Sequence, residues 1–196
     1  MKKRLPTLRQ LKSLMKKIAK ENGIEEQVNN SWCHSTVVWR LANNIARLAK
    51  RNGYQINFQL LKVGCYVHDI GRMITGGKGS KELRPAIYHF YEGYQLMKQY
   101  GYPQLARICV SHAAGVGLDK QTNKGYGFIS RNFFPRTIEE KIIAYADART
   151  SYKKGEGPYI GSFNKAYNRF KKYRGVGKRL KENQRFIQKI TKGKIR

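Results

Sequence analysis

The chain has 196 residues, of which 40% are hydrophobic and 12% aromatic, so it can bury a real core and is not expected to be disordered. Forty Lys and Arg residues oppose 12 Asp and Glu residues, which gives a formal net charge of +28 and a field that attracts polyanions such as nucleic acids and nucleotides. No apolar run approaches the roughly 18 residues that span a bilayer, and the basic N-terminus lacks the apolar stretch of a signal peptide. A membrane protein is therefore excluded, and a cytoplasmic location is expected.

The three cysteines, Cys33, Cys65 and Cys109, are widely spaced, lie in apolar segments and form no C-x-x-C pair. An odd number of cysteines with this spacing argues against a disulfide scaffold. We expect reduced thiols in the core of a cytoplasmic protein.

Apolar residues three or four positions apart predict helices along most of the chain. A first helix is expected over residues 7–21, stopped by Gly23, and a second over residues 31–51. Asn57 is a plausible N-cap for a third helix, which is expected to end at Gly71 with that glycine in the left-handed conformation.

The glycine-rich stretch 75–80 predicts a loop. Pro85 suits the first turn of a fourth helix, which Gly101 closes, and Pro103 suits the start of a fifth. These assignments rest on the fixed φ angle of proline and on the conformational freedom of glycine at helix ends.

Residues 115–135 show no clear period and are expected to form an irregular loop. Thr137 and Glu140 then have the spacing of a capping box ahead of another apolar helix. No strand-like alternation stands out, so the sequence predicts an all-α domain.

The composition changes near the C-terminus. Residues 148–196 contain sixteen Lys and Arg residues against two acidic ones, a net charge of +14, with Tyr and Phe interleaved. Helices are expected over 161–173 and 177–190. We interpret this part as a basic appendage, either docked on the catalytic body with its aromatic residues packed against it or loosely tethered.

The placement of the few histidines is informative. His34, His68, His89 and His112 each lie in an otherwise apolar or aromatic segment, and Asp147 follows an apolar run. A buried charged group is costly unless it is paired or bound to a metal. One such histidine is usually a satisfied core residue, but five residues on five predicted helices favour a converging ligand set for Fe, Mn, Ni, Co or Zn.

The adjacent pair His68-Asp69 adds a geometric constraint. Neighbours on a helix point about 100° apart, so both side chains reach one ion only near the end of the helix. Gly71 allows the chain to turn away at that point.

The order His34, His68-Asp69, Asp147 on a helical frame resembles the HD superfamily of metal-dependent phosphohydrolases, and the run HDIG at residues 68–71 resembles its subgroup of that name. This resemblance implies an HD-domain helical bundle. It divides the chain into an N-terminal basic helix, an HD phosphohydrolase domain and a basic C-terminal helical appendage, at residues 1–29, 30–150 and 151–196.

The resemblance also implies a divalent transition metal cofactor, with two ions expected. The first ion would be held by His34, His68, Asp69 and Asp147. His89 and His112 would hold the second, with Asp69 bridging. This six-ligand pattern is similar to that of the bacterial HD hydrolases that cleave diadenosine tetraphosphate symmetrically.

The expected reaction is hydrolysis of a phosphoester or phosphoanhydride of a nucleotide-type substrate by a metal-activated hydroxide that Asp69 orients. Arg72, one turn past Asp69, is expected to hold a phosphate oxygen. Lys78 and Lys81, in and beside the glycine-rich loop, are expected to cover the substrate's phosphates, with solvated surface charge as the alternative. Arg72-Met73 stands where stringent-response hydrolases of the superfamily carry an acidic pair.

A second hypothesis is an RNA- or ribosome-associated binding protein whose HD core is structural or regulatory. The basic C-terminal segment supports it, because interleaved cations and aromatic rings suit phosphate contact and base stacking. The complete ligand set favours an enzyme.

Overall fold

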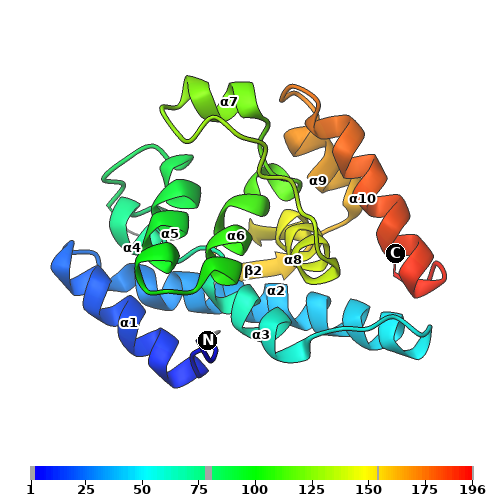
Figure 1. Ribbon diagram of the computed structural model, residues 1–196, viewed down its shortest axis with the longest axis horizontal. Helices are drawn as coiled ribbons and strands as arrows, with labels where there is room; N and C mark the ends of the chain where they lie inside the picture. Colours follow the sequence, from blue (N-terminus) through cyan, green and yellow to red (C-terminus); the bar gives the residue numbers. More distant parts are fainter. Residues whose placement is uncertain (1–2, 78–80, 154, 196) are drawn as a thin grey trace.

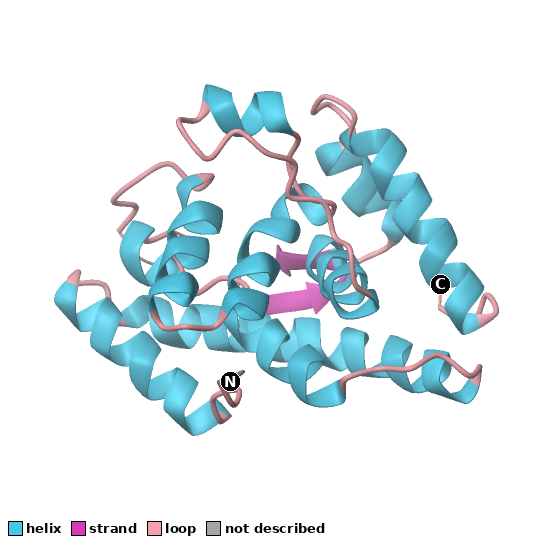
Figure 2. Cartoon of the chain, viewed as in Figure 1, coloured by secondary structure: helices cyan, strands magenta, loops and turns pink. Residues whose placement is uncertain are grey.

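The computed structural model describes residues 3–77, 81–153 and 155–195. Within them the chain is mostly helical and forms one two-stranded hairpin, so the predicted helical frame is confirmed (Figures 1 and 2). The elements are α1 (Leu8–Glu21), α2 (Glu26–Arg51), α3 (Phe58–Val67), α4 (Arg72–Thr75), α5 (Tyr88–Gln99), α6 (Pro103–Ser111), the 3-10 turn η1 (Ala113–Gly115), α7 (Lys120–Gly125), α8 (Ile138–Arg149), β1 (Thr150–Lys153), β2 (Gly157–Ile160), α9 (Phe163–Phe170) and α10 (Val176–Thr191). No helix in these ranges has both the length and the apolar character needed to cross a bilayer.

Helix α2 is the element against which much of the fold packs. It contacts α1, α3, α4, α8, α10 and both strands. Figure 1 shows it lying across the base of the molecule, with α5, α6 and α8 above it. Its buried residues recur with a helical period from Val28 to Ala49, as a helix face turned to a core requires. That face carries His34 into the interior.

Several helices begin at capping residues, of which the sequence had indicated Asn57 and Pro103. Thr7 and Gln10 form a complete capping box at the start of α1. The side chain of Asn57 accepts a hydrogen bond from the Leu60 N–H at 2.9 Å. Pro103 occupies the first turn of α6, where its missing N–H has no helical partner to lose.

Thr137 caps α8, but the predicted capping box is incomplete. The Thr137 hydroxyl accepts from the Glu140 N–H at 3.2 Å, whereas the Glu140 carboxylate turns elsewhere. It binds the Arg107 guanidinium at 2.9 and 3.0 Å and accepts from the Arg136 N–H at 2.7 Å. Because Arg107 lies on α6, this half-buried ion pair ties α6 to α8.

Two predictions of the chain's local structure were wrong. Residues 115–135 contain α7, which Asp119 caps by accepting from the Thr122 N–H at 2.8 Å. The C-terminal part contains the antiparallel hairpin, with Thr150 opposite Ile160. A six-residue helix and four-residue strands are too short to impose a readable hydrophobic period.

Pro85 and Cys33 also differ from expectation. Pro85 lies ahead of α5 and not in its first turn, and its carbonyl accepts from the Tyr88 N–H at 3.0 Å. Cys33 is exposed on α2, whereas Cys65 and Cys109 are buried as expected. Burial raises the pKa of both buried thiols, which keeps them protonated and unreactive.

The C-terminal helices are docked on the rest of the helical body, not tethered to it. Ile187, Ile190 and Ile195 belong to the main hydrophobic core. The side chain of Asn52, at the end of α2, donates to the Ile190 carbonyl at 2.8 Å, and Asn183 donates to a carbonyl of α8 at 3.2 Å. The last helix is therefore part of the folded body.

We expect Ile190→Ala to lower the free energy of unfolding by about 2–5 kcal/mol, because it leaves a cavity at a fully buried site. The measurement is urea unfolding followed by circular dichroism. Lys189→Ala, at the exposed neighbouring position, is the matched control and should change stability by less than about 0.5 kcal/mol. Equal, small effects of both substitutions would show that α10 is not part of the core.

Candidate metal centre

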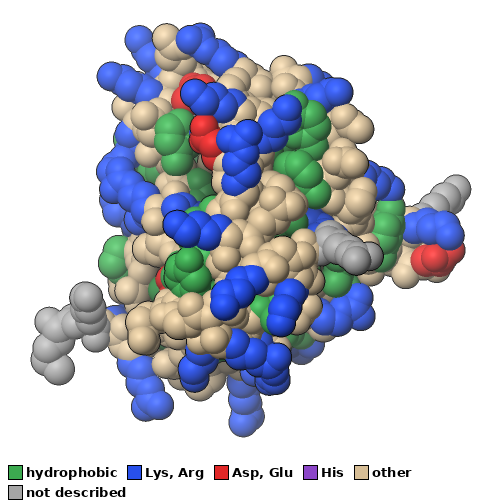
Figure 3. Space-filling view, turned by 90° about the vertical axis from the view of Figure 1, so that its right-hand side faces the viewer, with side chains coloured by type: hydrophobic (Ala, Val, Ile, Leu, Met, Phe, Trp, Pro, Cys, Tyr) green, Lys and Arg blue, Asp and Glu red, His purple; other side chains and the backbone are tan. Residues whose placement is uncertain are grey.

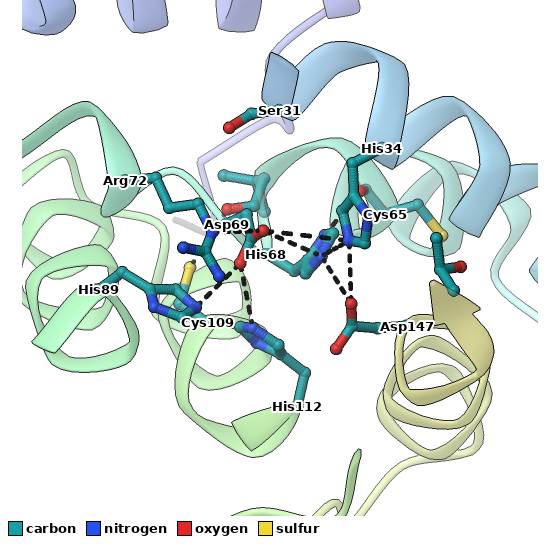
Figure 4. Close-up of polar contacts among 12 residues, drawn as sticks. Ser31, His34, Cys65, His68, Asp69, Arg72, His89, Cys109, His112 and Asp147 are labelled. Carbon is teal, nitrogen blue, oxygen red and sulfur yellow. Dashed lines mark hydrogen bonds and ion pairs between the residues drawn. The ribbon is translucent and has the colours of Figure 1, made fainter. Parts of the chain in front are cut away.

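The fold brings the six sequence-predicted ligands together in one cluster (Figure 4). They come from α2, the turn after α3, α5, the end of α6, and α8: His34, His68, Asp69, His89, His112 and Asp147. All are buried except Asp147, which is half-buried. Residues up to 113 positions apart in sequence thus converge on one interior point.

One part of the cluster is formed by His34, His68 and Asp147. The Oδ1 atom of Asp147 lies 2.9 Å from Nε2 of His34 and 3.5 Å from Nε2 of His68. The two Nε2 atoms are 3.3 Å apart. All three donor atoms lie within 4.8 Å of one another, a spacing that can hold a metal ion.

Asp69 joins this part to the second one. Its Oδ1 atom lies 2.9 Å from Nε2 of His89 and 3.4 Å from Nε2 of His112. Its Oδ2 atom lies 3.9 Å from Nε2 of both His34 and His68. Each carboxylate oxygen therefore faces a different pair of histidines.

The outer nitrogens of three histidines are held by backbone carbonyls. Nδ1 of His68, His89 and His112 each contacts a carbonyl three or four residues earlier in the chain. Donation from Nδ1 to a carbonyl fixes the imidazole tautomer and leaves Nε2 with a lone pair for a metal. In all three rings Nε2 faces the cluster.

Buried nitrogen atoms without hydrogen-bond partners indicate that the cluster fits a divalent cation. When Nδ1 carries the proton, the buried Nε2 atoms of His89 and His112 face the acceptor Oδ1 of Asp69 at 2.9 and 3.4 Å and have no hydrogen-bond partner within the described ranges. A buried nitrogen without a partner costs about 1–3 kcal/mol. A cation between the imidazole lone pairs and the carboxylates of Asp69 and Asp147 removes that cost, and the mixed N/O donor set suits a transition metal.

The protonation states of both carboxyl groups and of His89 also suit metal binding. At His68, burial lowers the pKa, but the charges of Asp69 and Asp147 outweigh it and raise the pKa. Burial opposes ionisation of Asp69, but Arg72, 2.8 Å away, and the nearby imidazoles hold the pKa of this carboxyl well below its usual range. Burial likewise opposes ionisation of Asp147, but the neighbouring rings of His34 and His68 keep its pKa low. Burial and the charge of Arg72 lower the pKa of His89 to about 4. At neutral pH the carboxylates are anionic and His89 is neutral, as ligands must be.

The HDIG run at residues 68–71 forms a tight turn. Helix α3 ends at Val67, and the pair His68-Asp69 lies in the turn before α4. Gly71 has φ −61° and is not the left-handed residue that the sequence predicted. A Cβ atom there would lie 2.0 Å from the carbonyl oxygen of His89. Glycine is required at this position because α5 packs directly against the turn.

The expected substrate-binding residues have different outcomes. Arg72 is half-buried beside Asp69 and faces the cluster. Lys78 lies outside the described residues. Lys81 is exposed and does not line the cavity that opens over the cluster.

A cavity of about 450 Å³ opens over the cluster. Sequence reasoning missed much of its wall, which is built by residues of the C-terminal segment: Tyr152, Arg169, Phe170, Tyr173, Arg174, Val176 and Arg179. Tyr152 also stacks on the His34 ring, with centroids 5.8 Å apart. The signal was present as interleaved aromatic and basic residues, but only the fold shows that they face the ligands.

Residues 32–151 match the family model described as HD domain. The chain is 28% identical over 135 residues to uncharacterized protein MJ0778 of Methanocaldococcus jannaschii, which covers 69% of this chain and 70% of that protein. It is also 30% and 31% identical over 100 and 90 residues to the tRNA (cytidine(56)-2′-O)-methyltransferases of Thermoplasma volcanium and Picrophilus torridus. Those matches cover 51% and 45% of this chain but only 26% and 24% of the methyltransferases.

The fold is similar to the HD domain of the L. monocytogenes phosphodiesterase PgpH, with a TM-score of 0.51 and 20% identity over 91% of this chain and 94% of that one. That likeness concerns the helical frame. The family match covers more than half of the chain and includes every residue of the cluster. The chain therefore belongs to the HD superfamily of metal-dependent phosphohydrolases.

Proposed function

We propose that the protein hydrolyses a phosphoester or phosphoanhydride of a nucleotide-type substrate, with two divalent ions held by the six ligands. The observation that carries this proposal is the position of Asp69. One oxygen of its carboxylate faces His89 and His112, and the other faces His34 and His68. A carboxylate shared in this way is suited to bridging two ions.

His34, His68, Asp69 and Asp147 would hold one ion, and Asp69, His89 and His112 the other. When bound, such ions lower the pKa of a coordinated water and neutralise charge on phosphoryl oxygens. The side chains fix the donor atoms, since three imidazoles are anchored through Nδ1. Asp69 also orients the attacking water from its position at the centre of the cluster.

Arg72 is proposed to hold an oxygen of the reacting phosphate. Its Nε atom donates to Asp69 at 2.8 Å, and the side chain lines the cavity. A guanidinium fixed in this way keeps its charge and loses little side-chain entropy when it binds an anion. Lys78, from the adjoining glycine-rich loop, remains a proposed phosphate ligand.

The ligands are expected to depend on one another. His68→Ala should remove bound metal and phosphatase activity together and leave the helical spectrum unchanged, since the ring contributes a donor atom to the cluster. Elemental analysis combined with a phosphatase and phosphodiesterase panel in Mn, Co or Fe measures both properties. Asp119→Asn is the matched control, because Asn also caps helices, and it should retain the metal. A metal-loaded His68→Ala protein would refute the site.

Substituting a ligand of the second ion should leave the first ion bound. His89→Ala and His112→Ala should each retain about one metal ion per chain and lose most turnover, because one ion holds the transferring phosphate less well than two. Metal titration monitored by calorimetry, with kinetics on the same samples, measures this. If the unmodified protein never binds more than one ion, the single-ion version with four ligands replaces the proposal.

Nucleic-acid binding is a second candidate function. Figure 3 shows the side of the molecule that carries α9 and α10, where Lys and Arg side chains are many and acidic ones few. A face of this kind attracts a phosphate backbone. The similar segments in two tRNA methyltransferases also make RNA a reasonable partner to test.

If RNA binds this face and about six cations contact phosphates, the affinity for single-stranded RNA should fall with salt, with a log–log slope near −4. Replacing the exposed α10 residues Lys178, Lys181, Arg185 and Lys189 by Gln should make that slope shallower by up to about 3. Filter binding across a salt series measures both slopes. Salt-independent binding, or none, would remove this candidate.

A further inference from the structure

We propose that the C-terminal segment binds a second phosphate of the substrate, separate from the phosphate that reacts at the metal ligands. This inference rests on the proposed function, because it assigns a substrate class to the same cavity. It concerns residues beyond 151, where the family match ends. Recognition would thus be supplied by a part of the chain that the HD domain match does not include.

Three arginines of this segment line the cavity: Arg169, Arg174 and Arg179. With Arg72 they give the cavity four guanidinium groups against two carboxylates, Asp69 and Asp147. Both carboxylates already face histidines at 2.9 Å. Asp119 and Glu182 lie near enough to Arg179 to act on its charge, but neither lines the cavity. The side of the three arginines that faces the cavity therefore carries excess positive charge for a ligand.

Arg169 is held close to the cluster. Its Nη2 atom donates to the carbonyl of Ala148, the residue that follows the proposed ligand Asp147. Its guanidinium lies over the ring of Phe170, 4.3 Å from the centroid. Both contacts restrain the side chain, so an anion that binds it pays a smaller entropic cost.

Arg174 and Arg179 flank the start of α10. Arg179 donates from Nη2 to the Gly117 carbonyl at 3.3 Å, and its guanidinium packs over the ring of Phe134 at 4.5 Å. Its buried Nε atom has no hydrogen-bond partner in the described part of the chain. Arg174 is exposed at the cavity wall. The positive end of the α10 dipole adds to the same field.

The arginines approach the cavity from two sides. Arg72 lies on α4, and the other three lie on or beside α9 and α10, on the opposite side of the molecule in Figure 1. Two separated cationic groups match a ligand with two separated phosphates better than a ligand with one. Exposed Tyr126 and Tyr173 also line the cavity and offer ring faces on which a base can stack.

The substrate class is therefore a nucleotide unit that carries two phosphates on different positions. A free nucleoside bisphosphate and the 5′-phosphorylated end of an RNA chain share this chemistry. In the latter, the first phosphodiester supplies the second phosphate. In both, one phosphate reaches the metal ligands while the other binds the α9–α10 arginines.

The test compares adenosine 5′-monophosphate, adenosine 3′,5′-bisphosphate and a short 5′-phosphorylated oligoribonucleotide as substrates of the full-length protein loaded with Mn. The variants are Arg174→Ala and Arg179→Ala. The matched control is Lys194→Ala, an exposed cation of the same C-terminal segment that does not line the cavity. Calorimetric titration of the metal-free protein with the bisphosphate gives a second readout that needs no catalysis.

We expect kcat/KM for the bisphosphate to fall at least about tenfold in each arginine variant, since a charge-assisted contact is lost, while kcat/KM for the monophosphate changes by less than about threefold. Bisphosphate affinity should fall by a similar factor, and Lys194→Ala should leave it within about twofold. Of the oligoribonucleotide and the free bisphosphate, the one with the higher kcat/KM identifies the natural source of the second phosphate.

Equal losses for the mono- and bisphosphate would overturn the inference and reduce the arginines to general steering of anions. Unchanged bisphosphate affinity in both arginine variants would also overturn it. If the unmodified protein cleaves no phosphoester at all, the proposed function fails, while the calorimetric comparison still decides whether the C-terminal arginines bind a second phosphate.

Discussion

The structure depends on one constraint: a buried carboxylate, Asp69, that must stay ionised. Removing a carboxylate from water is expensive unless charge and hydrogen bonds compensate. Here Arg72 contributes a full positive charge at 2.8 Å, and imidazoles surround both oxygens. Three of the four imidazoles come from α2, α5 and the end of α6, so satisfying one carboxylate fixes how these helices meet.

The close packing of the HDIG turn serves that same constraint. Gly71 allows the backbone of α5 to approach the turn, and Gly93 continues the contact, since a Cβ at position 93 would lie 3.3 Å from the Gly71 nitrogen. The two glycines thus allow the main chains of the turn and of α5 to lie close together. The position of His89 relative to Asp69 follows from how closely α5 can approach.

Much of the fold was predictable because most helices are long enough to show a period and carry caps, as at Thr7, Asn57 and Pro103. The ligand set was predictable by type, since histidines and aspartates are scarce and lie in apolar segments. The role proposed for Asp69, as a bridge between two ions, was suggested only by the resemblance to a family. The hairpin was not predictable, because Thr150–Lys153 is too short to alternate visibly.

The cavity wall could not have been found from local patterns. In the sequence, Arg179 and Tyr173 look like other residues of a basic segment. They lie near the proposed ligands only because α10 docks on the rest of the fold. That docking depends on contacts such as Asn52 with Ile190, 138 positions apart. Long-range burial leaves little trace in a single sequence.

Helix α10 has one face in the core, through Ile187 and Ile190, and its first turn at the cavity, through Val176 and Arg179. A ligand held between this turn and Arg72 would join the end of the chain to its middle. Occupancy and folding are then linked equilibria, so the ligand stabilises the native state by RT ln(1 + [L]/Kd). The last helix would open less often in the liganded protein, and its amide hydrogens would exchange more slowly with solvent.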